Sequence, residues 1–487
     1  MKWSITHIYL VKRKESEVII VQEKGMVNKR FISQNAVVIV LIGLCFLLTS
    51  TGYLAWAYHI MALTETPVSE AVTLVAGYLF QAAGIGLYSL LVKRRADLIR
   101  VSMYVVPVMH MLCLVPAVLG ASLVQSLVFG FGQNLLCGWI AGYYLYRLTC
   151  GSKMTDSAKN FGIGYAVAIV LTWVLSLAGR KISGLWQSTG MLVVCLILTA
   201  ILIIAVRMTP HCEEAVPEEK KPETYLQLPK GRSLKKLLLA AGCLVMLFSI
   251  VNSCGFGFPS EDLASGIDLE LSRLFYAAGL LAAGYINDKN RRYGAACALA
   301  ALAVPFLIIA IKGEPVSLMI FWALSYFTFG FYTVYRVILF SDIARQTKLL
   351  YLAGAGLMIG RAGDAVGETL CLSLSAVFPV LAGITALLFI ISALLLLRIY
   401  PVIYIPEKTR QRSEREIFDR YSARHDLSGR EREILRFLLN EKTNQEIAEE
   451  LSISEGTVKY HVHNLLQKTS CHNRVELLHA FAAEHDT

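Results

Sequence analysis

The most constraining feature of this sequence is a series of long apolar runs separated by short polar loops. A helix needs about 20 apolar residues to cross a bilayer. We find twelve such runs, centred near residues 47, 80, 110, 134, 169, 197, 246, 278, 302, 328, 361 and 388. Of the 487 residues, 55% are hydrophobic and only 17% are charged, whereas soluble domains carry about 25% charged residues. The pattern predicts an all-α, polytopic bundle of twelve transmembrane helices that contacts the lipid bilayer.

Positive charges alternate between the loops that join these runs. The loops 93–100 and 287–293 are rich in Lys and Arg, whereas 59–70 and 259–270 contain neither. Lys and Arg accumulate in loops on the cytoplasmic side of a membrane. The alternation, which a basic pair in the fifth loop breaks only mildly, predicts a multi-pass protein of the cell membrane. Because the number of crossings is even, both termini are expected in the cytoplasm.

The longest loop divides the chain. The segment 207–234 contains four prolines and no helical period, which is typical of a hinge. The sequence therefore predicts a cytoplasmic N-terminal segment, a first six-helix half, a cytoplasmic central loop, a second six-helix half, a linker whose middle could form a short charged helix, and a C-terminal domain. Their expected bounds are 1–35, 36–206, 207–234, 235–400, 401–424 and 425–487. Met1 and Met26 are alternative first residues.

Charged residues cluster inside the eleventh run. Arg361, Asp364 and Glu368 are spaced by three and four residues, so they share one face of a helix and opposite charges can pair. Arg336 adds a cation in the tenth run. Because charges inside a membrane are costly, they usually mark a functional site.

Two interpretations of these charges remain open. In the first, they line a central cavity that holds an unknown small-molecule ligand, polar or anionic. In the second, Arg361 and Asp364 form a structural ion pair, and Arg336 lies close enough to the inner surface to reach water. For Arg273 and His110, we favour a structural role.

The stretch "GYINDKNRR" links two of the runs. Its glycine, Gly284, would permit close approach of two helices, and Asp288 could cap a neighbouring helix. With Arg291 and Arg292, these residues resemble the signature loop of the major facilitator superfamily, Gly-x-x-x-Asp-Arg-x-Gly-Arg-Arg, although Lys289 replaces an Arg. The resemblance implies a transporter-like fold of two six-helix halves.

The last sixty residues have the pattern of a small helical domain. Thr443 and Glu446 form a capping-box pair at the start of one helix, and Ser454 suits the N-cap of the next. That second helix would bury Val458, Val462, Leu465 and Leu466 and expose its polar residues. A helix of this width fits the major groove of DNA.

From Leu427 to Leu478, the motifs "LSGREREIL", "TNQEIAEELSISEGTVKYHV" and "NRVELL" resemble the LuxR-type helix-turn-helix domain in order and spacing. The resemblance implies a four-helix domain that binds double-stranded promoter DNA and dimerises through its last helix. It implies that three residues face bases and four contact the sugar-phosphate backbone: Thr457, Val458 and Lys459, and His461, Asn464, Lys468 and Asn444. Gln445 and Glu441 depart from the residues usual in the family, which are Lys and Gly.

The charge of this tail is not by itself that of a DNA-binding domain. Residues 401–487 hold 13 Lys and Arg against 15 Asp and Glu, so a lone domain should bind phosphates weakly. Dimerisation or clustering in the membrane would raise the effective concentration.

These observations predict a membrane-bound one-component transcriptional regulator of a bacterial type, whose membrane domain senses a small molecule or the state of the membrane. RNA polymerase is a further candidate partner. The sequence holds no catalytic constellation, no CxxC pair and no metal-ligand spacing, so we expect no enzyme activity, metal or cofactor. Two alternatives stay open: a major-facilitator-type secondary transporter with a regulatory DNA-binding tail, and a regulator that is released by cleavage after Pro401.

Overall fold

The computed structural model describes residues 34–60, 62–63, 67–181, 185–209, 232–256, 269–310, 315–404, 407–440 and 442–483, which form helices and no strand. The chain divides into two compact units, Met1–Tyr404 and Ile405–Thr487. Three earlier predictions fall outside the described residues: the cytoplasmic segment before residue 34, the choice between Met1 and Met26, and most of the central hinge.

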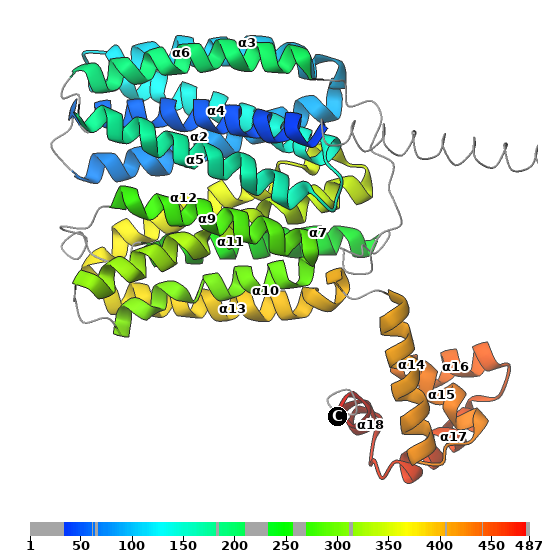
Figure 1. Ribbon diagram of the computed structural model, residues 1–487. Coiled ribbons are helices and arrows are strands. Elements are labelled where there is room, and N and C mark those ends of the chain that lie inside the picture. Colours follow the sequence, from blue (N-terminus) through cyan, green and yellow to red (C-terminus); the bar gives the residue numbers. More distant parts are fainter. Residues whose placement is uncertain are drawn as a thin grey trace, which may run out of the picture. The chain divides into compact units, whose positions relative to one another are not determined.

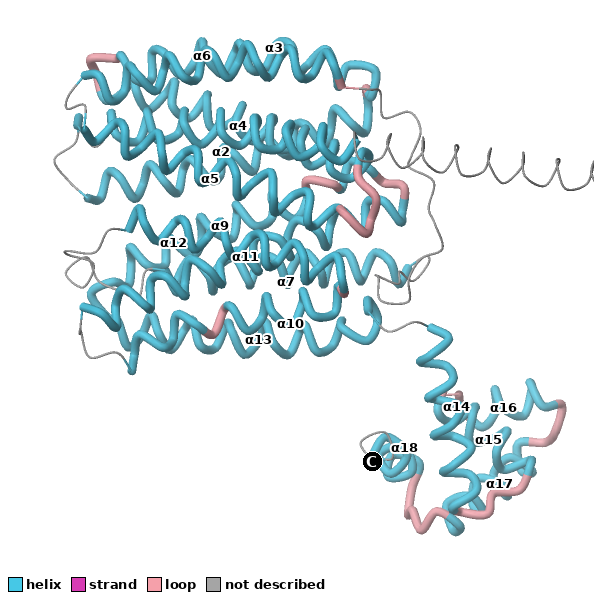
Figure 2. The backbone as a smooth tube through the Cα atoms, viewed as in Figure 1, coloured by secondary structure: helices cyan, strands magenta, loops and turns pink. Residues whose placement is uncertain are grey.

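The first unit is a bundle of long helices (Figures 1 and 2). Each of the twelve apolar runs corresponds to one described helix or helical stretch, and six lie on either side of the hinge. The first half contains the helix Gln34–Ile60, α2 (Pro67–Arg94), α3 (Ile99–Leu119), α4 (Leu123–Gly151), α5 (Ser157–Lys181) and α6 (Leu185–Met208). The second contains α7 (Arg232–Phe256), α9 (Leu269–Lys289), α10 (Arg291–Ala301) continued by η2 (Val304–Ala310), α11 (Pro315–Thr347), α12 (Ala355–Leu374) and α13 (Phe378–Tyr404).

Among the described residues, nine of these helices are long and apolar enough by themselves to cross a membrane. The other three, α9, α10 and α12, do not meet these criteria of length and hydropathy. The helix α10 has only 11 residues, and α12 carries Arg361, Asp364 and Glu368. Large apolar side chains such as Leu112, Ile204 and Leu397 are exposed on the outside of the bundle, where lipid would cover them. The predicted all-α, six-plus-six membrane fold is therefore confirmed.

Glycines set the helix crossings in the same way in both halves. A Cβ atom on Gly138 of α4 would lie 2.0 Å from the carbonyl oxygen of Gln81 in α2, and a Cβ on Gly279 of α9 would lie 1.9 Å from that of Phe327 in α11. Helices in lipid associate by close packing of small residues rather than by the hydrophobic effect. The equivalent second and fourth helices of each half thus touch backbone to backbone.

The second unit contains five helices: α14 (Glu407–Arg424), α15 (Gly429–Leu439), α16 (Asn444–Leu451), α17 (Glu455–Lys468) and α18 (Arg474–Ala483). Its core joins Ile434, Leu435, Leu438, Val458, Leu465 and Leu477 with three residues of α14, namely Ile417, Phe418 and Tyr421. The sequence predicted residues 401–424 as a linker whose middle could form a short helix; residues 407–424 of it are the helix α14, which packs into this core. The last membrane helix, α13, continues to Tyr404.

Candidate functional site

Helices α16 and α17 form a tightly capped pair. The side chains of Thr443 and Glu446 cap the start of α16 reciprocally. That helix ends at Ser452, whose φ of 53° lies in the left-handed region. Ser454 then caps α17, because its hydroxyl accepts a hydrogen bond from the Thr457 N–H at 3.1 Å. Each cap satisfies N–H groups that a helix leaves unpaired, so the angle between the helices is fixed locally.

One face of α17 is exposed while the other is buried in the core. Val458 and Leu465 are 0% exposed, and Tyr460 is 64% exposed. The Lys459 side chain is 63% exposed, and its Nζ lies 2.9 Å from Glu455, one turn earlier. This exposed pair is screened and easily exchanged for other partners. The helix can therefore present a lysine, a phenol and a threonine (Thr457) to a groove.

In the membrane unit, Asp364 of α12 binds two arginines. Its Oδ2 accepts a hydrogen bond from Arg336 Nη1 at 3.2 Å and lies 3.5 Å from Arg361 Nη1. The Arg336 side chain, from α11, is 3% exposed and also donates to the Tyr332 hydroxyl at 2.8 Å. The Arg361 side chain is 21% exposed and lies over the ring of Tyr78, 4.9 Å from its centroid.

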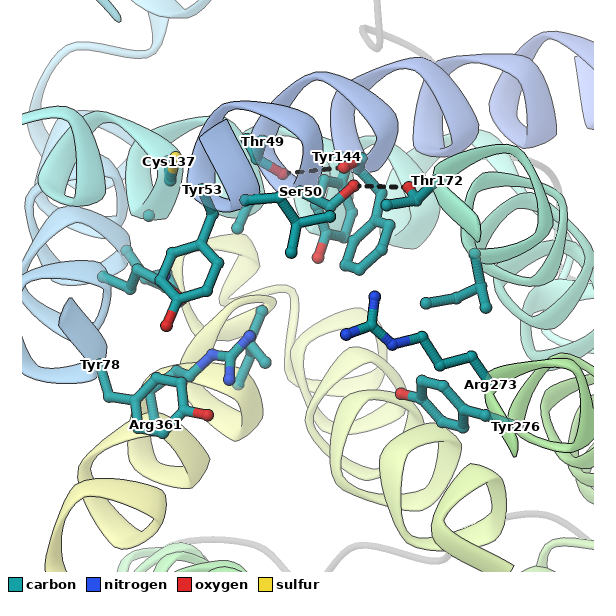
Figure 3. A pocket seen from close by; sticks show the side chains of 18 of the residues that line it. Thr49, Ser50, Tyr53, Tyr78, Cys137, Tyr144, Thr172, Arg273, Tyr276 and Arg361 are labelled. Carbon is teal, nitrogen blue, oxygen red and sulfur yellow. Dashed lines mark hydrogen bonds between the residues drawn. The ribbon is translucent and has the colours of Figure 1, made fainter. Parts of the chain in front are cut away.

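A cavity of about 280 Å³ lies between the two halves of this unit (Figure 3). The helix Gln34–Ile60 and α2, α4 and α5 line it from the first half, and α9, α11 and α12 line it from the second. Arg361 and Arg273 both belong to its lining, and Figure 3 shows their guanidinium groups on different sides of the opening. The volume is close to the lower end of small-molecule sites.

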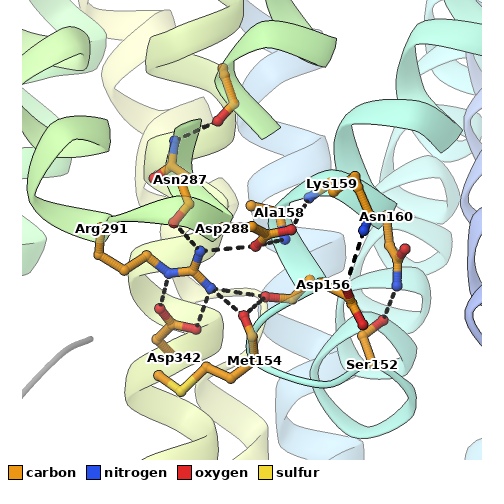
Figure 4. Close-up of polar contacts among 12 residues, drawn as sticks. Ser152, Met154, Asp156, Ala158, Lys159, Asn160, Asn287, Asp288, Arg291 and Asp342 are labelled. Carbon is orange, nitrogen blue, oxygen red and sulfur yellow. Dashed lines mark hydrogen bonds and ion pairs between the residues drawn. The ribbon is translucent and has the colours of Figure 1, made fainter. Parts of the chain in front are cut away.

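The signature loop holds the two halves together at another place (Figure 4). The carboxylate of Asp288 accepts hydrogen bonds from the backbone N–H groups of Ala158 and Lys159, at 2.9 and 2.7 Å, and so caps the start of α5. A Cβ on Gly284 would lie 2.8 Å from the Ala158 carbonyl oxygen, so the glycine allows this approach. Both of the roles that we predicted for the loop are therefore observed.

Two arginines of the loop extend this contact. Arg291 donates to Asp342 of α11 at 2.7 Å and to the Met154 carbonyl of the first half at 2.7 Å. Arg292 donates from Nε to the carbonyl oxygen of Tyr404 at 2.9 Å. Tyr404 is the last residue of the membrane unit, so one short loop binds both the first half and the end of α13.

Comparison with known proteins identifies the C-terminal domain. The family profile described as "Bacterial regulatory proteins, luxR family" matches residues 425–481. The spore germination protein GerE of Bacillus subtilis (strain 168) is 48% identical over 56 residues, which are 11% of this chain and 76% of GerE. The chain belongs to the luxR family of bacterial regulatory proteins.

Two further relatives are the transcriptional regulatory protein DesR of Bacillus subtilis (strain 168), 40% identical over 60 residues, and the uncharacterized response regulatory protein YgeK of Escherichia coli (strain K12), 41% identical over 63 residues. These matches cover 12% and 13% of this chain. The chain spans 30% of DesR and 43% of YgeK, less than half of either relative.

The membrane unit is similar in fold to solved transporters. The human organic anion transporter MFSD10 (TETRAN) matches with a TM-score of 0.55 and 13% identity, over 74% of this chain and 99% of its own. The Escherichia coli fucose:proton symporter FucP matches with a TM-score of 0.53 and 14% identity, over 75% of this chain and 98% of FucP. The proton:xylose symporter XylE matches with a TM-score of 0.56 and 11% identity, over 76% of this chain and 96% of XylE. The luxR-type domain is thus fused to a multi-pass membrane domain of the major facilitator fold.

The structure corrects the prediction for Val458, one of the expected base contacts of the luxR-type domain. Its side chain is fully buried in the core, so it cannot reach a base edge. The prediction missed Tyr460, which is exposed on the same helix. The helical period could have found it, because the spacing that buries both Val458 and Leu465 turns position 460 outward.

The other predicted DNA contacts are placed as follows. Thr457 and Lys459 are exposed, whereas His461, Asn464 and Asn444 are partly buried. The Lys468 ammonium donates to Glu431 at 2.9 Å and to the Asp426 carbonyl at 2.8 Å. In this arrangement Lys468 ties the end of α17 to the cap of α15.

The capping boxes give the luxR-type unit a defined pH dependence. Burial would raise the pKa of Glu431, but hydrogen bonds from Lys468 and from Ser428 lower it below the ordinary value, and hydrogen bonds from Thr443 lower the pKa of Glu446. A lowered folded-state pKa adds stability above about pH 4.3, the value for an unfolded glutamate, and this stability is lost as the pH falls further.

We therefore expect the free energy of unfolding of the isolated unit, residues 405–487, to fall steadily below about pH 4.3. In the variant Glu431→Gln, the free energy of unfolding should be about 1 kcal/mol lower at pH 7, as expected for a damaged cap. It should also fall less steeply as the pH is lowered. Glu433→Gln, at an exposed position on the same helix, is the control. Urea unfolding followed by circular dichroism measures both, and an unchanged acid slope in Glu431→Gln contradicts the assignment.

The predicted ligand residues are only partly brought together. Arg361 lines the cavity, whereas Arg336, Asp364 and Glu368 are not among its lining residues. Arg273, for which the sequence favoured a structural role, does line it. His110 is buried and bonded to Gln133 at 3.1 Å, as its expected structural role implies.

Proposed function

We propose that this protein is a membrane-bound one-component regulator of transcription. Its membrane domain senses a small molecule or the state of the membrane, and its luxR-type domain binds promoter DNA. The observation that carries the proposal is the direct attachment of the two: only residues 405 and 406 lie between α13, the last membrane helix, and α14, which belongs to the core of the luxR-type unit. We propose that a change at the end of α13 passes through these two residues to a helix of the DNA-binding domain.

The proposal requires that the C-terminus lies on the side of the membrane that holds the chromosome. Twelve crossings and the alternating basic loops support a cytoplasmic location of both termini in the cell membrane. A reporter enzyme that works only outside the cytoplasm, fused after Thr487, should be inactive. An active fusion would overturn the proposal.

The ligand acts by shifting the population of the membrane domain between two arrangements of its halves. It can favour one arrangement of the two halves only as far as it binds that arrangement more tightly. Arg292 offers a route for this shift, because the loop that holds α5 also holds the carbonyl of Tyr404. On the DNA side, we propose a homodimer formed through α18, with contact to RNA polymerase as a further step. Dimerisation compensates for the weak phosphate binding of a domain with a net charge of −2.

The test is transcript profiling in a strain that lacks the protein. We expect a defined set of transcripts to change, to return when the full chain is supplied, and to stay changed when the Lys459→Ala full chain is supplied at equal membrane abundance. Arg420→Ala, which removes an exposed cation from α14, is the matched control and should restore them. Full restoration by Lys459→Ala would refute the DNA-binding role.

A secondary transporter with a regulatory tail is the second candidate. It is favoured by the match to the folds of two proton symporters over nearly their whole length and by Glu368, a carboxylate in a membrane helix. If the protein transports, Glu368→Gln should abolish uptake of a labelled substrate into vesicles. If it only senses, vesicles should show no uptake above those without the protein, while gene control persists.

A further inference from the structure

The charges beside the cavity do not balance. The carboxylate of Asp364 faces two guanidinium groups, and it is closer to Arg336, at 3.2 Å, than to Arg361, at 3.5 Å. Arg336 is the more buried of the two and has further partners in the hydroxyl and ring of Tyr332. One negative charge is therefore mainly committed to the deeper arginine.

Arg361 keeps most of its hydrogen-bonding capacity. A guanidinium has five N–H donors, and the interactions of Arg361 among the described residues are the long contact to Asp364 and the stacking on Tyr78. Its neighbour Glu368, two turns later on α12, forms no ion pair with it in the described part of the chain. A guanidinium inside a membrane domain needs acceptors, and Arg361 lines the cavity from which they can come.

The rest of the described lining fits an acid with an apolar body. It contains a second guanidinium, that of Arg273, and no Asp, Glu or Lys. Hydroxyl groups come from Thr49, Ser50, Thr172 and several tyrosines (Figure 3). The lining also includes the rings of Phe46, Tyr53, Tyr276 and Phe329. Two arginines disfavour a cationic ligand, a neutral polar ligand would not match the charge of Arg361, and the rings offer an apolar surface.

We propose that this cavity binds a small organic acid. Its carboxylate is held by Arg361 in a bidentate contact, and its apolar body packs among the rings of both halves. The proposal rests on the proposed function and names the ligand class of the sensor. Because the lining comes from both halves, such a ligand bridges them and favours the arrangement in which they close on it.

The test uses the purified full chain in detergent and measures the midpoint of thermal unfolding by intrinsic fluorescence. The probes are benzoate, hexanoate and glutarate, each compared with its neutral amide, and sodium sulfate at equal ionic strength. We expect at least one acid to raise the midpoint more than its amide and more than sulfate. Amides that match the acids, or sulfate that matches them, would overturn the proposal.

Variants locate the effect. Arg361→Gln should weaken binding of the effective acid by about tenfold to 100-fold, the range for hydrogen bonds to a charged group, and Arg361→Lys should fall between, since lysine lacks the bidentate geometry. Arg398→Gln, at an exposed position of α13, is the control and should bind normally. Leu357→Trp fills the cavity without changing its charge and should also prevent binding. Normal binding by Arg361→Gln or by Leu357→Trp would refute the site.

The outcomes separate this inference from the proposed function. Acid binding is measured without DNA, and the dependence of transcripts on Lys459 is measured without a known ligand. If transcripts depend on Lys459 while the acids fail, only the ligand class is wrong. If acids bind through Arg361 while transcripts ignore Lys459, the regulatory proposal is wrong and the binding site stands.

Discussion

Lys459→Ala is expected to weaken binding to a target promoter by about tenfold to 100-fold, because a good contact to a base edge contributes about 1–3 kcal/mol. Lys459 is the exposed cation in the first turns of α17, and its only described partner is Glu455, which is itself exposed. Exchange of that partner for a base or a phosphate requires little desolvation. Tyr460→Ala should produce a smaller loss, since a phenol offers one hydrogen bond and apolar contact.

Fluorescence anisotropy of a labelled promoter fragment with the C-terminal unit, residues 405–487, measures this effect, and a scrambled fragment gives the non-specific background. Arg420→Ala removes the same charge from α14 and should change both affinities little. Lys468→Ala gives a second comparison. Its lysine bonds to Glu431 and to the Asp426 carbonyl, so we expect a loss of domain stability rather than of discrimination. Equal losses on both fragments would mean that Lys459 contacts only phosphates.

The parts of this fold that the sequence predicts well are those controlled by local patterns. Each apolar run must pair its own backbone groups inside lipid, so its length alone predicts a helix. The capping box of Thr443 and Glu446 is likewise local, and it appears as predicted. The role of Asp288 at the start of α5 could be predicted because the N-terminus of a helix favours a negatively charged side chain.

The composition of the cavity could not be predicted in this way, because it depends on how distant helices pack. In the sequence, Arg336 and Arg361 are both charged residues within an apolar run, and nothing local distinguishes them. Only packing decides that Arg336 lies behind Asp364 while Arg361 faces the opening. The same holds for Arg273, which reaches the cavity from α9. The packing of α14 into the core of the luxR-type unit was also not predicted, because its three core residues, Ile417, Phe418 and Tyr421, lie in a strongly charged segment.

Arg291→Gln is expected to have the largest effect on the stability of the membrane unit. The side chain is 3% exposed and lies between two carboxylates, Asp342 at 2.7 Å and Asp288 at 3.0 Å. It also donates to the carbonyl of Met154 at 2.7 Å, which belongs to the first half. Removing one member of a buried ion pair costs about 3–5 kcal/mol, because the remaining charge is left unpaired.

This loss should lower the midpoint of thermal unfolding of the full chain in detergent and the amount of protein found in the membrane. Lys289→Gln removes an exposed charge from the same loop and should do neither. The double variant Arg291→Gln/Asp342→Asn tests the cause. It removes the charges of Arg291 and Asp342, while Asp288 keeps its bonds to the N–H groups of Ala158 and Lys159, so it should recover a large part of the stability lost by Arg291→Gln alone. If the double variant recovers no stability, the loss comes chiefly from the hydrogen bonds of Arg291 to the carbonyls of Met154 and Asn287, which both variants lack. In that case Arg291 would hold the halves together chiefly through backbone carbonyls.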